Sequence, residues 1–243
     1  MRLLLGSGGF STIERRDGWI REVDNFLGPL KKVLFIPYAL ADHDGYVRAI
    51  KDRGFHGPGR ETIGIHRTKN PLKAVLEADV ISVGGGNSWR LLASLYEHNL
   101  IQAIREKVFS GTPYVGVSAG TNMACPTMKT TNDMPITYPP SLNALHLVPF
   151  QVNPHYFSGA THIKNEDGSY IQYGGETRDD RIREFHEMNN APVIGLWEGS
   201  ILRIEEKKVK LTGHQARARL FRLGENAREL YGPGDLSGVL PLL

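Results

Sequence analysis

Short apolar segments alternate along the chain with longer segments of helical spacing. Most of the apolar segments end at glycine, proline or a small polar residue, which is typical of strands buried on both faces of a parallel sheet. They are residues 3–5, 33–36, 80–83, 114–117 and 193–196. Between them, apolar side chains recur every three or four positions, which predicts amphipathic helices. The helical segments are residues 19–30, 89–96, 100–108 and 182–188.

The alternation of strand and helix predicts an α/β fold built from right-handed strand–helix–strand units. The last part of the chain differs, because residues 200–204, 209–211 and 217–223 resemble strands with no helix between them. We expect a mostly parallel sheet flanked by helices, with a small C-terminal antiparallel addition. No repeat or linker is visible, so residues 1–243 are predicted to form one domain. Residues 156–175 are rich in Gly, Ser, Asn and Asp and predict a long loop.

The composition narrows the class of protein. The 243 residues are 40% hydrophobic and 23% charged, as in ordinary globular proteins. The net charge is +3, without the continuous basic stripe of a nucleic-acid-binding protein. The N-terminal apolar run is too short for a signal peptide, and no run approaches membrane-spanning length. The single cysteine, Cys125, excludes an internal disulfide and is expected to be a small buried residue. We therefore expect a cytoplasmic protein that binds neither nucleic acid nor membrane.

The string GVSAG at residues 116–120 matches the G-x-S-x-G pattern around a nucleophilic serine, here Ser118. An apolar segment precedes it and residues 121–125 can begin a helix, which is the context that a nucleophile elbow needs. The flanking glycines permit a sharp turn, and the helix N-terminus directs its amides toward developing negative charge. The alternatives are an ordinary serine in a tight turn and a phosphate-binding turn.

A second glycine turn, residues 84–86, also follows a predicted strand and precedes a predicted helix. In a parallel sheet both turns lie at the carboxyl ends of the strands, where ligands bind. Acyl transfer needs two donors for the oxyanion, and we expect the amides of Ala119 and Gly86 to supply them. Dinucleotide binding is the alternative, but Trp89 stands where the last glycine of G-x-G-x-x-G is due.

A serine nucleophile needs a base, usually histidine, and a carboxylate that fixes the tautomer of the histidine. Of the nine histidines, His155 is the candidate, because it follows a predicted strand end and Pro154 and would be held at the sheet edge. Asp133, in a polar loop before Pro135, and Glu198, at another strand end, are both candidates for the acid. Each could equally be a turn residue, and spacing does not choose between them.

Several strings together resemble peptidase E, the family of α-aspartyl dipeptidases. They are GVSAG at 116–120, ACP at 124–126, TTNDMPI at 130–136, NPH at 153–155, GGGN at 84–87, GETR at 175–178 and FIPY at 35–38. The string at 130–136 is the most specific of them, and the resemblance spans residues 1–205. It implies a single α/β domain similar to the class I glutamine amidotransferases, of the flavodoxin-like type.

The resemblance also implies an activity, the hydrolysis of Asp-Xaa dipeptides with a free amino-terminal aspartate, through an aspartyl-enzyme. It implies no cofactor and no metal, and the partner is a small peptide bound by a monomer or homodimer. Carried over to this sequence, Ser118 is the nucleophile and His155 the base. Asp133 is the third member of the triad, with Glu198 as its competitor.

For substrate binding, the resemblance implies that the amides of Gly86 and Ala119 bind the oxyanion and that Arg178 binds the aspartyl side chain of the substrate. A planar, permanently charged guanidinium suits a carboxylate, although without the resemblance a surface arginine paired with Asp179 or Glu176 would be favoured. The segment after His155 is longer than the family pattern, and a lid there would change which substrates enter. The alternatives are a cyanophycinase-like peptidase acting on β-aspartyl links, against which the string at 130–136 argues, and a non-catalytic amidotransferase-like binding domain.

Overall fold

The computed structural model describes residues 1–172 and 174–243. Among these residues, the larger sheet contains eight strands. In spatial order they are β14 (Gly234–Asp235), β11 (Lys208–Gly213), β10 (Ser200–Glu205), β1 (Leu3–Gly6), β5 (Tyr114–Val117), β4 (Ile81–Val83), β2 (Lys32–Ile36) and β3 (Glu61–Gly64). The strands from β1 to β3 in this order run parallel, whereas β10, β11 and β14 pair antiparallel.

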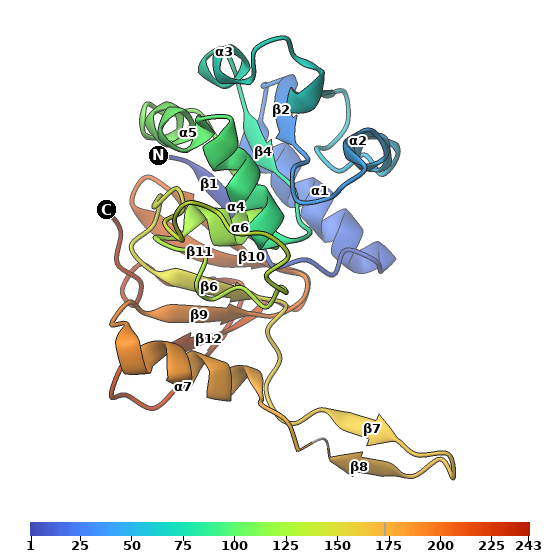
Figure 1. Ribbon diagram of the computed structural model, residues 1–243, viewed down its shortest axis with the longest axis vertical. Helices are drawn as coiled ribbons and strands as arrows, with labels where there is room; N and C mark the ends of the chain where they lie inside the picture. Colours follow the sequence, from blue (N-terminus) through green and yellow to red (C-terminus); the bar gives the residue numbers. More distant parts are fainter. Residues whose placement is uncertain (173) are drawn as a thin grey trace.

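A second sheet lies beside the first (Figure 1). Its strands are, in order, β13 (Arg228–Tyr231), β12 (Arg217–Phe221), β9 (Val193–Leu196) and β6 (Gln151–Pro154). Residues 193–196 form a buried strand that pairs in parallel, as predicted, but in this sheet and not in the larger one. The predicted antiparallel strands also form, yet they are divided, since β10 and β11 extend the larger sheet and β12 joins the second.

Helices cover both faces of the larger sheet (Figure 1). They are α1 (Ile13–Leu27), α2 (His43–Asp52), the 3₁₀ helix η1 (Ile65–Arg67), α3 (Pro71–Leu76), α4 (Ser88–Glu97), α5 (Leu100–Phe109) and α6 (Ala119–Ala124), whereas α7 (Arg178–Met188) packs on the second sheet. The alternation of side chains along β1 separates two apolar layers. Leu4 packs with Trp19 and Phe26 of α1, whereas Leu3 and Leu5 belong to the layer formed with α4, α5 and α6. The predicted mixed α/β fold with a large, mostly parallel sheet flanked by helices is thus confirmed.

The second sheet is covered on its outer face by α7 (Figure 1). Ile182 of α7 packs with Val193 of β9, Phe221 of β12 and the buried Tyr156. The inner face of the same sheet contributes Ile194 and other side chains to the apolar layer beneath α4 and α5. The two sheets therefore share one continuous core.

The segment predicted as a long loop contains a hairpin of β7 (His162–Lys164) and β8 (Tyr170–Gln172). The hairpin projects away from the body of the molecule (Figure 1), and all six of its strand residues are exposed. Residue 173, also within the predicted loop, lies outside the described residues. The predicted long loop thus includes a short hairpin, in which Ile163 lies opposite Ile171.

The described helices bear on membrane insertion, and the surroundings of the single cysteine bear on its reactivity. Within the described ranges, no helix has the length and apolar character needed to cross a membrane. Cys125 is buried as predicted, donates to the backbone oxygen of Thr121 and accepts from the backbone nitrogen of Val152 at 3.2 Å. Burial raises the pKa of this thiol to about 12, so it is an inert part of the core.

His56 is a buried histidine outside the candidate site. Its Nδ1 lies 2.8 Å from Thr62 Oγ1 and its Nε2 lies 2.8 Å from Ser82 Oγ. Burial lowers the pKa of His56 to about 3, whereas in the unfolded chain this pKa returns to roughly 6.5. Below pH 6.5 the unfolded chain therefore takes up a proton that the folded protein excludes. The stability that depends on neutral His56 is fully present above pH 6.5 and is lost as the pH falls toward 3.

We expect acidification from pH 7 to pH 5 to remove about 2 kcal/mol of unfolding free energy through His56 alone. The measurement is urea unfolding of the wild type and of His56→Gln at both pH values. The variant is less stable at pH 7, but its loss on acidification should be smaller than that of the wild type. Equal losses in the two proteins would show that His56 is not the group responsible.

Candidate active site

Ser118 lies in the turn between β5 and α6, at the carboxyl end of a central parallel strand. Its φ of 55° and ψ of −112° are uncommon for a residue with a side chain. The backbone N–H of Ser118 donates to the oxygen of Gly6 at 3.0 Å, and the Ser118 oxygen accepts from the N–H of Thr121 at 2.9 Å. This is the strand–turn–helix context that the sequence pattern indicates for a nucleophile elbow.

The glycines on either side of Ser118 are required by close packing. A Cβ on Gly120 would overlap with the backbone oxygen of Val83 in β4. A Cβ on Gly116 would come within 2.6 Å of the backbone oxygen of Gly120. Of these three residues, Ser118 is the one with a positive φ. The two glycines have a different role, because their lack of a side chain lets α6 approach the sheet closely.

His155 follows the last residue of β6 and reaches Ser118 across the sheet edge. Its Nε2 lies 2.7 Å from Ser118 Oγ, and its Nδ1 lies 2.6 Å from Glu198 Oε1. The two strands that precede these residues pair in parallel, with Pro154 of β6 opposite Leu196 of β9. Because both strands end at the same edge, His155 and Glu198 emerge side by side. The structure thus forms a continuous hydrogen-bonded chain from serine through histidine to glutamate.

Asp133, expected to orient His155, takes a different position. Its Oδ2 accepts from the backbone N–H of Ser88 at 2.8 Å and from Thr131 Oγ1 at 3.0 Å. Its backbone oxygen accepts from Trp89 Nε1 at 3.1 Å. These contacts fix the loop at residues 130–136 against the start of α4. The expectation that Asp133 contacts His155 is therefore corrected, since the Nδ1 atom of the histidine is paired with Glu198.

A third glycine turn, at residues 6–9, holds the His155–Glu198 pair and was not found from the sequence as part of the site. Ser7 Oγ accepts from the backbone N–H of His155 at 2.8 Å and donates to the oxygen of Leu196 at 2.7 Å. A Cβ on Gly8 would overlap with the ring of His155, and one on Gly9 with the carboxylate of Glu198. The signal available in the sequence was that this turn, like the other two, follows an apolar strand segment.

The turn at Gly84–Gly86 lies directly beside Ser118. A Cβ on Gly85 would come within 3.0 Å of Ser118 Cβ. Gly86 has a φ of 127°, which a side chain would disfavour, and a Cβ there would also crowd the oxygen of Ala39. On the other side of Ser118, Ala119 is the first residue of α6, and the N–H groups in the first turn of a helix have no partner within it. Both expected oxyanion donors therefore lie in segments adjacent to the serine.

Arg178 is the first residue of α7, whose start is fixed by a capping box between Thr177 and Asp180. Its Nη1 donates to Asn132 Oδ1, and its guanidinium carbon lies 5.6 Å from the ring centre of Phe157. Its Nε is buried and has no partner among the described residues. Burial lowers the pKa of Arg178 from its ordinary value, but an arginine remains charged at neutral pH.

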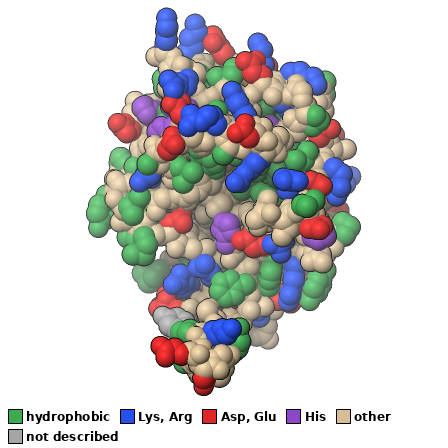
Figure 2. Space-filling view, turned by 90° about the vertical axis from the view of Figure 1, so that its right-hand side faces the viewer, with side chains coloured by type: hydrophobic (Ala, Val, Ile, Leu, Met, Phe, Trp, Pro, Cys, Tyr) green, Lys and Arg blue, Asp and Glu red, His purple; other side chains and the backbone are tan. Residues whose placement is uncertain are grey.

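Two cavities meet at Ser118 and His155. The small cavity, of about 250 Å³, extends toward the loop at residues 130–136 and α7, and its lining includes Asp133 and Arg178. The large cavity, of about 600 Å³, extends toward α1 and α2. The space-filling view shows a hollow near the middle of one face, with histidine and acidic side chains beside it (Figure 2). The serine thus has room for a substrate group on either side.

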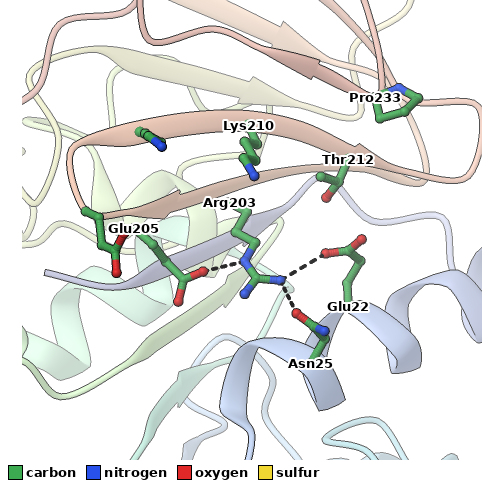
Figure 3. A pocket seen from close by; sticks show the side chains of 9 residues that line it. Glu22, Asn25, Arg203, Glu205, Lys210, Thr212 and Pro233 are labelled. Carbon is green, nitrogen blue, oxygen red and sulfur yellow. Dashed lines mark hydrogen bonds and ion pairs between the residues drawn. The ribbon is translucent and has the colours of Figure 1, made fainter.

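Another cavity, of about 540 Å³, contains none of these residues (Figure 3). Its central cation, Arg203, pairs with Glu205 at 2.5 Å and with Glu22 at 3.8 Å, and donates to Asn25 at 2.6 Å. These charges already satisfy one another. In residues 1–172 and 174–243, no three His, Cys, Asp or Glu side chains are grouped as a metal site would require.

The chain is similar to known peptidases over most of its length. The model of peptidase family S51 matches residues 2–212. Peptidase E of Streptomyces coelicolor is 48% identical over 221 residues, covering 90% of this chain and 86% of the relative. A probable alpha-aspartyl dipeptidase of Drosophila melanogaster is 45% identical, covering 87% of this chain and 84% of the relative. The crystal structure of a putative peptidase E from Listeria monocytogenes has a similar fold, with a TM-score of 0.61, 22% identity and coverage of 88% of this chain and 98% of that one. The resemblance to peptidase E is confirmed, and the chain belongs to peptidase family S51.

Proposed function

We propose that this protein is a serine dipeptidase that hydrolyses Asp-Xaa dipeptides with a free amino-terminal aspartate. The observation that carries the proposal is the hydrogen-bonded chain Ser118–His155–Glu198, which opens onto a small cavity containing Arg178. The similarity to a probable alpha-aspartyl dipeptidase of Drosophila melanogaster supports the same substrate class.

The chemistry follows from the positions of the three side chains. Ser118 Oγ attacks the carbonyl carbon of the aspartyl residue while His155 Nε2 accepts the hydroxyl proton. Glu198 accepts a hydrogen bond from His155 Nδ1–H, which fixes the tautomer and stabilises the imidazolium that forms. His155 then protonates the leaving amine. A water molecule, deprotonated by His155, hydrolyses the aspartyl ester on Ser118 and completes the cycle.

The oxyanion of each tetrahedral intermediate would be held by the backbone N–H groups of Ala119 and Gly86. Both residues belong to turns that lie beside Ser118, and the Ala119 amide stands at the N-terminus of α6, where negative charge is favoured. Fixed backbone donors of this kind stabilise charge that develops only during the reaction.

The small cavity offers complementary charges for an amino-terminal aspartate. Arg178 would bind the β-carboxylate, since its buried Nε still lacks an acceptor. Asp133 is the single acid among the described residues that line this cavity. Its Oδ2 holds the start of α4, so its Oδ1 would accept the substrate ammonium. An asparaginyl substrate would leave the half-buried Arg178 without its counter-charge, which disfavours binding.

A panel of peptides tests the proposal. Wild-type protein is incubated with Asp-Leu, Asn-Leu, Glu-Leu, β-Asp-Leu and acetyl-Asp-Leu, and released leucine is measured. We expect hydrolysis of Asp-Leu alone. Asn-Leu lacks the β-carboxylate and acetyl-Asp-Leu lacks the free ammonium, whereas Glu-Leu and β-Asp-Leu hold the carboxylate at a different distance from the scissile bond. Preference for β-Asp-Leu would favour the cyanophycinase-like alternative, and hydrolysis of none would favour a non-catalytic binding domain.

Arg178→Ala is expected to lower kcat/KM for Asp-Leu by about 10³-fold, since it removes one partner of a desolvated charge pair. Arg181→Ala is the matched control, because it removes a half-exposed arginine from the same helix. Steady-state kinetics and thermal unfolding of both variants provide the measurement. An Arg178→Ala enzyme that hydrolyses Asp-Leu at the control's rate would contradict the assignment of this residue to the substrate.

We also propose the finer organisation that the family resemblance implies. A fold similar to the class I glutamine amidotransferases is supported by the position of Ser118 after a central parallel strand. A single domain over residues 1–243 is supported by the core that the two sheets share. Action in the cytoplasm is supported by the one cysteine being a buried free thiol. A monomer or homodimer stays a prediction.

A further inference from the structure

The large cavity is the place left for the leaving residue of the substrate. If the aspartyl residue occupies the small cavity, as in the proposed function on which this inference rests, the scissile bond lies at Ser118. The residue on the amine side of that bond must then enter the large cavity, which shares Ser118 and His155 with the small one. A dipeptide carries its α-carboxylate on that residue, so a carboxylate must lie in the large cavity.

One part of the wall of the large cavity is apolar and is held in place by aromatic contacts. Phe10 and Phe55 line the cavity with ring centres 6.0 Å apart, and both rest on the buried Trp19 at 4.7 and 4.9 Å. Trp19 Nε1 donates to the backbone oxygen of Phe55 at 2.9 Å. Val117 contributes a further apolar side chain. This wall suits the side chain of an apolar leaving residue.

The charged groups of the same cavity are two arginines. Arg16 comes from α1 and Arg53 follows the end of α2, and no acidic side chain is among the described lining residues. Among the described residues, Arg16 forms an ion pair only with its chain neighbour Asp17, at 3.5 Å and with both side chains about half exposed, which is a weak pair. Arg53 forms no ion pair with another described residue. By contrast, Arg60 is held by the Asp24 carboxylate at 2.6 Å and by four backbone oxygens.

Two guanidinium groups without a strong protein partner, in a cavity that begins at the nucleophile, form a receptor for an anion. We infer that Arg16 and Arg53 bind the C-terminal carboxylate of the leaving residue and so select dipeptides over longer peptides. In a longer peptide this carboxylate is replaced by a neutral amide, which gives the arginines no counter-charge. The same contact would be released with the product after the peptide bond is cleaved.

The test compares Asp-Leu with its C-terminal amide, Asp-Leu-NH₂. The variants are Arg16→Gln, Arg53→Gln and the pair together, and all of them change exposed side chains. The matched control is Arg21→Gln with Lys51→Gln, which removes the same charge from exposed positions on α1 and α2 outside the cavity. Steady-state kinetics give kcat/KM for both substrates, and thermal unfolding checks the fold.

The wild type and the charge-matched control are expected to prefer Asp-Leu over its amide by about tenfold, through KM. In the double variant this ratio falls to near one, and each single variant lies between. Equal hydrolysis of the two substrates by the wild type, or a preference retained in the double variant, would overturn the inference while leaving the proposed function intact. Failure of the wild type to hydrolyse either substrate would overturn both.

Discussion

Ser118→Ala is expected to lower kcat for Asp-Leu by about 10⁶-fold, as for serine peptidases that lose their nucleophile. The hydroxyl contacts His155 Nε2 at 2.7 Å and is the atom that forms the covalent bond in the proposed reaction. Alanine tolerates the positive φ of this turn about as well as serine does, so the elbow should persist. The measurement is leucine release, with circular dichroism and thermal unfolding as the check on folding.

The control for this variant is Ser110→Ala, which removes a serine hydroxyl from the exposed end of α5 and should leave activity unchanged. Cys125 cannot replace the lost nucleophile, because it is buried and its pKa is raised to about 12. Activity in Ser118→Ala within a hundredfold of the wild type would mean that another group forms the covalent bond, or that none is formed.

Glu198→Gln is expected to lower kcat by about 10⁴-fold with little change in folding. Glutamine fills the same space, but it can favour the wrong tautomer of His155 and cannot stabilise the imidazolium. We propose this role for Glu198 because its Oε1 lies 2.6 Å from His155 Nδ1, with the turn at Gly8 and Gly9 packed over the pair.

Asp133→Asn is the matched comparison, since it also neutralises one carboxylate near the site. It should act mainly on KM for Asp-Leu, because Asp133 is proposed to bind the substrate ammonium and does not contact His155. Its remaining oxygen can still accept from the N–H of Ser88. Separate measurements of kcat and KM decide the question. A larger loss of kcat in Asp133→Asn than in Glu198→Gln would return the orienting role to Asp133.

The sequence predicted much of the fold because the central strands are short apolar runs, and such runs occur where a strand is buried on both faces. The elbow at Ser118 could also be predicted, because its glycine pattern stands between an apolar run and a segment that can begin a helix. What the runs do not encode is which strands pair. Residues 193–196 have the same apolar character as β5, yet they pair with β6 in the second sheet.

The identity of the acid beside His155 depended on that pairing. Glu198 reaches the histidine because β6 and β9 are neighbours in register. Asp133 lies nearer to His155 in the sequence, but its loop is tied to the start of α4 by contacts between residues more than 40 positions apart. Local spacing carries no information about either arrangement. The two arginines of the large cavity were missed for a similar reason, since α1 and the end of α2 line one cavity only in the folded chain.

The most direct test of the account is to trap the acyl group on the enzyme. An activated ester of aspartate is mixed with the protein, so that acylation is faster than hydrolysis, and the reaction is quenched with acid and analysed by mass spectrometry. In the proposed mechanism, the wild type gains the mass of one aspartyl residue, located by proteolysis on the peptide that contains Ser118, and Ser118→Ala gains none. An aspartyl group on a different residue, or the same labelling of Ser118→Ala, would contradict it.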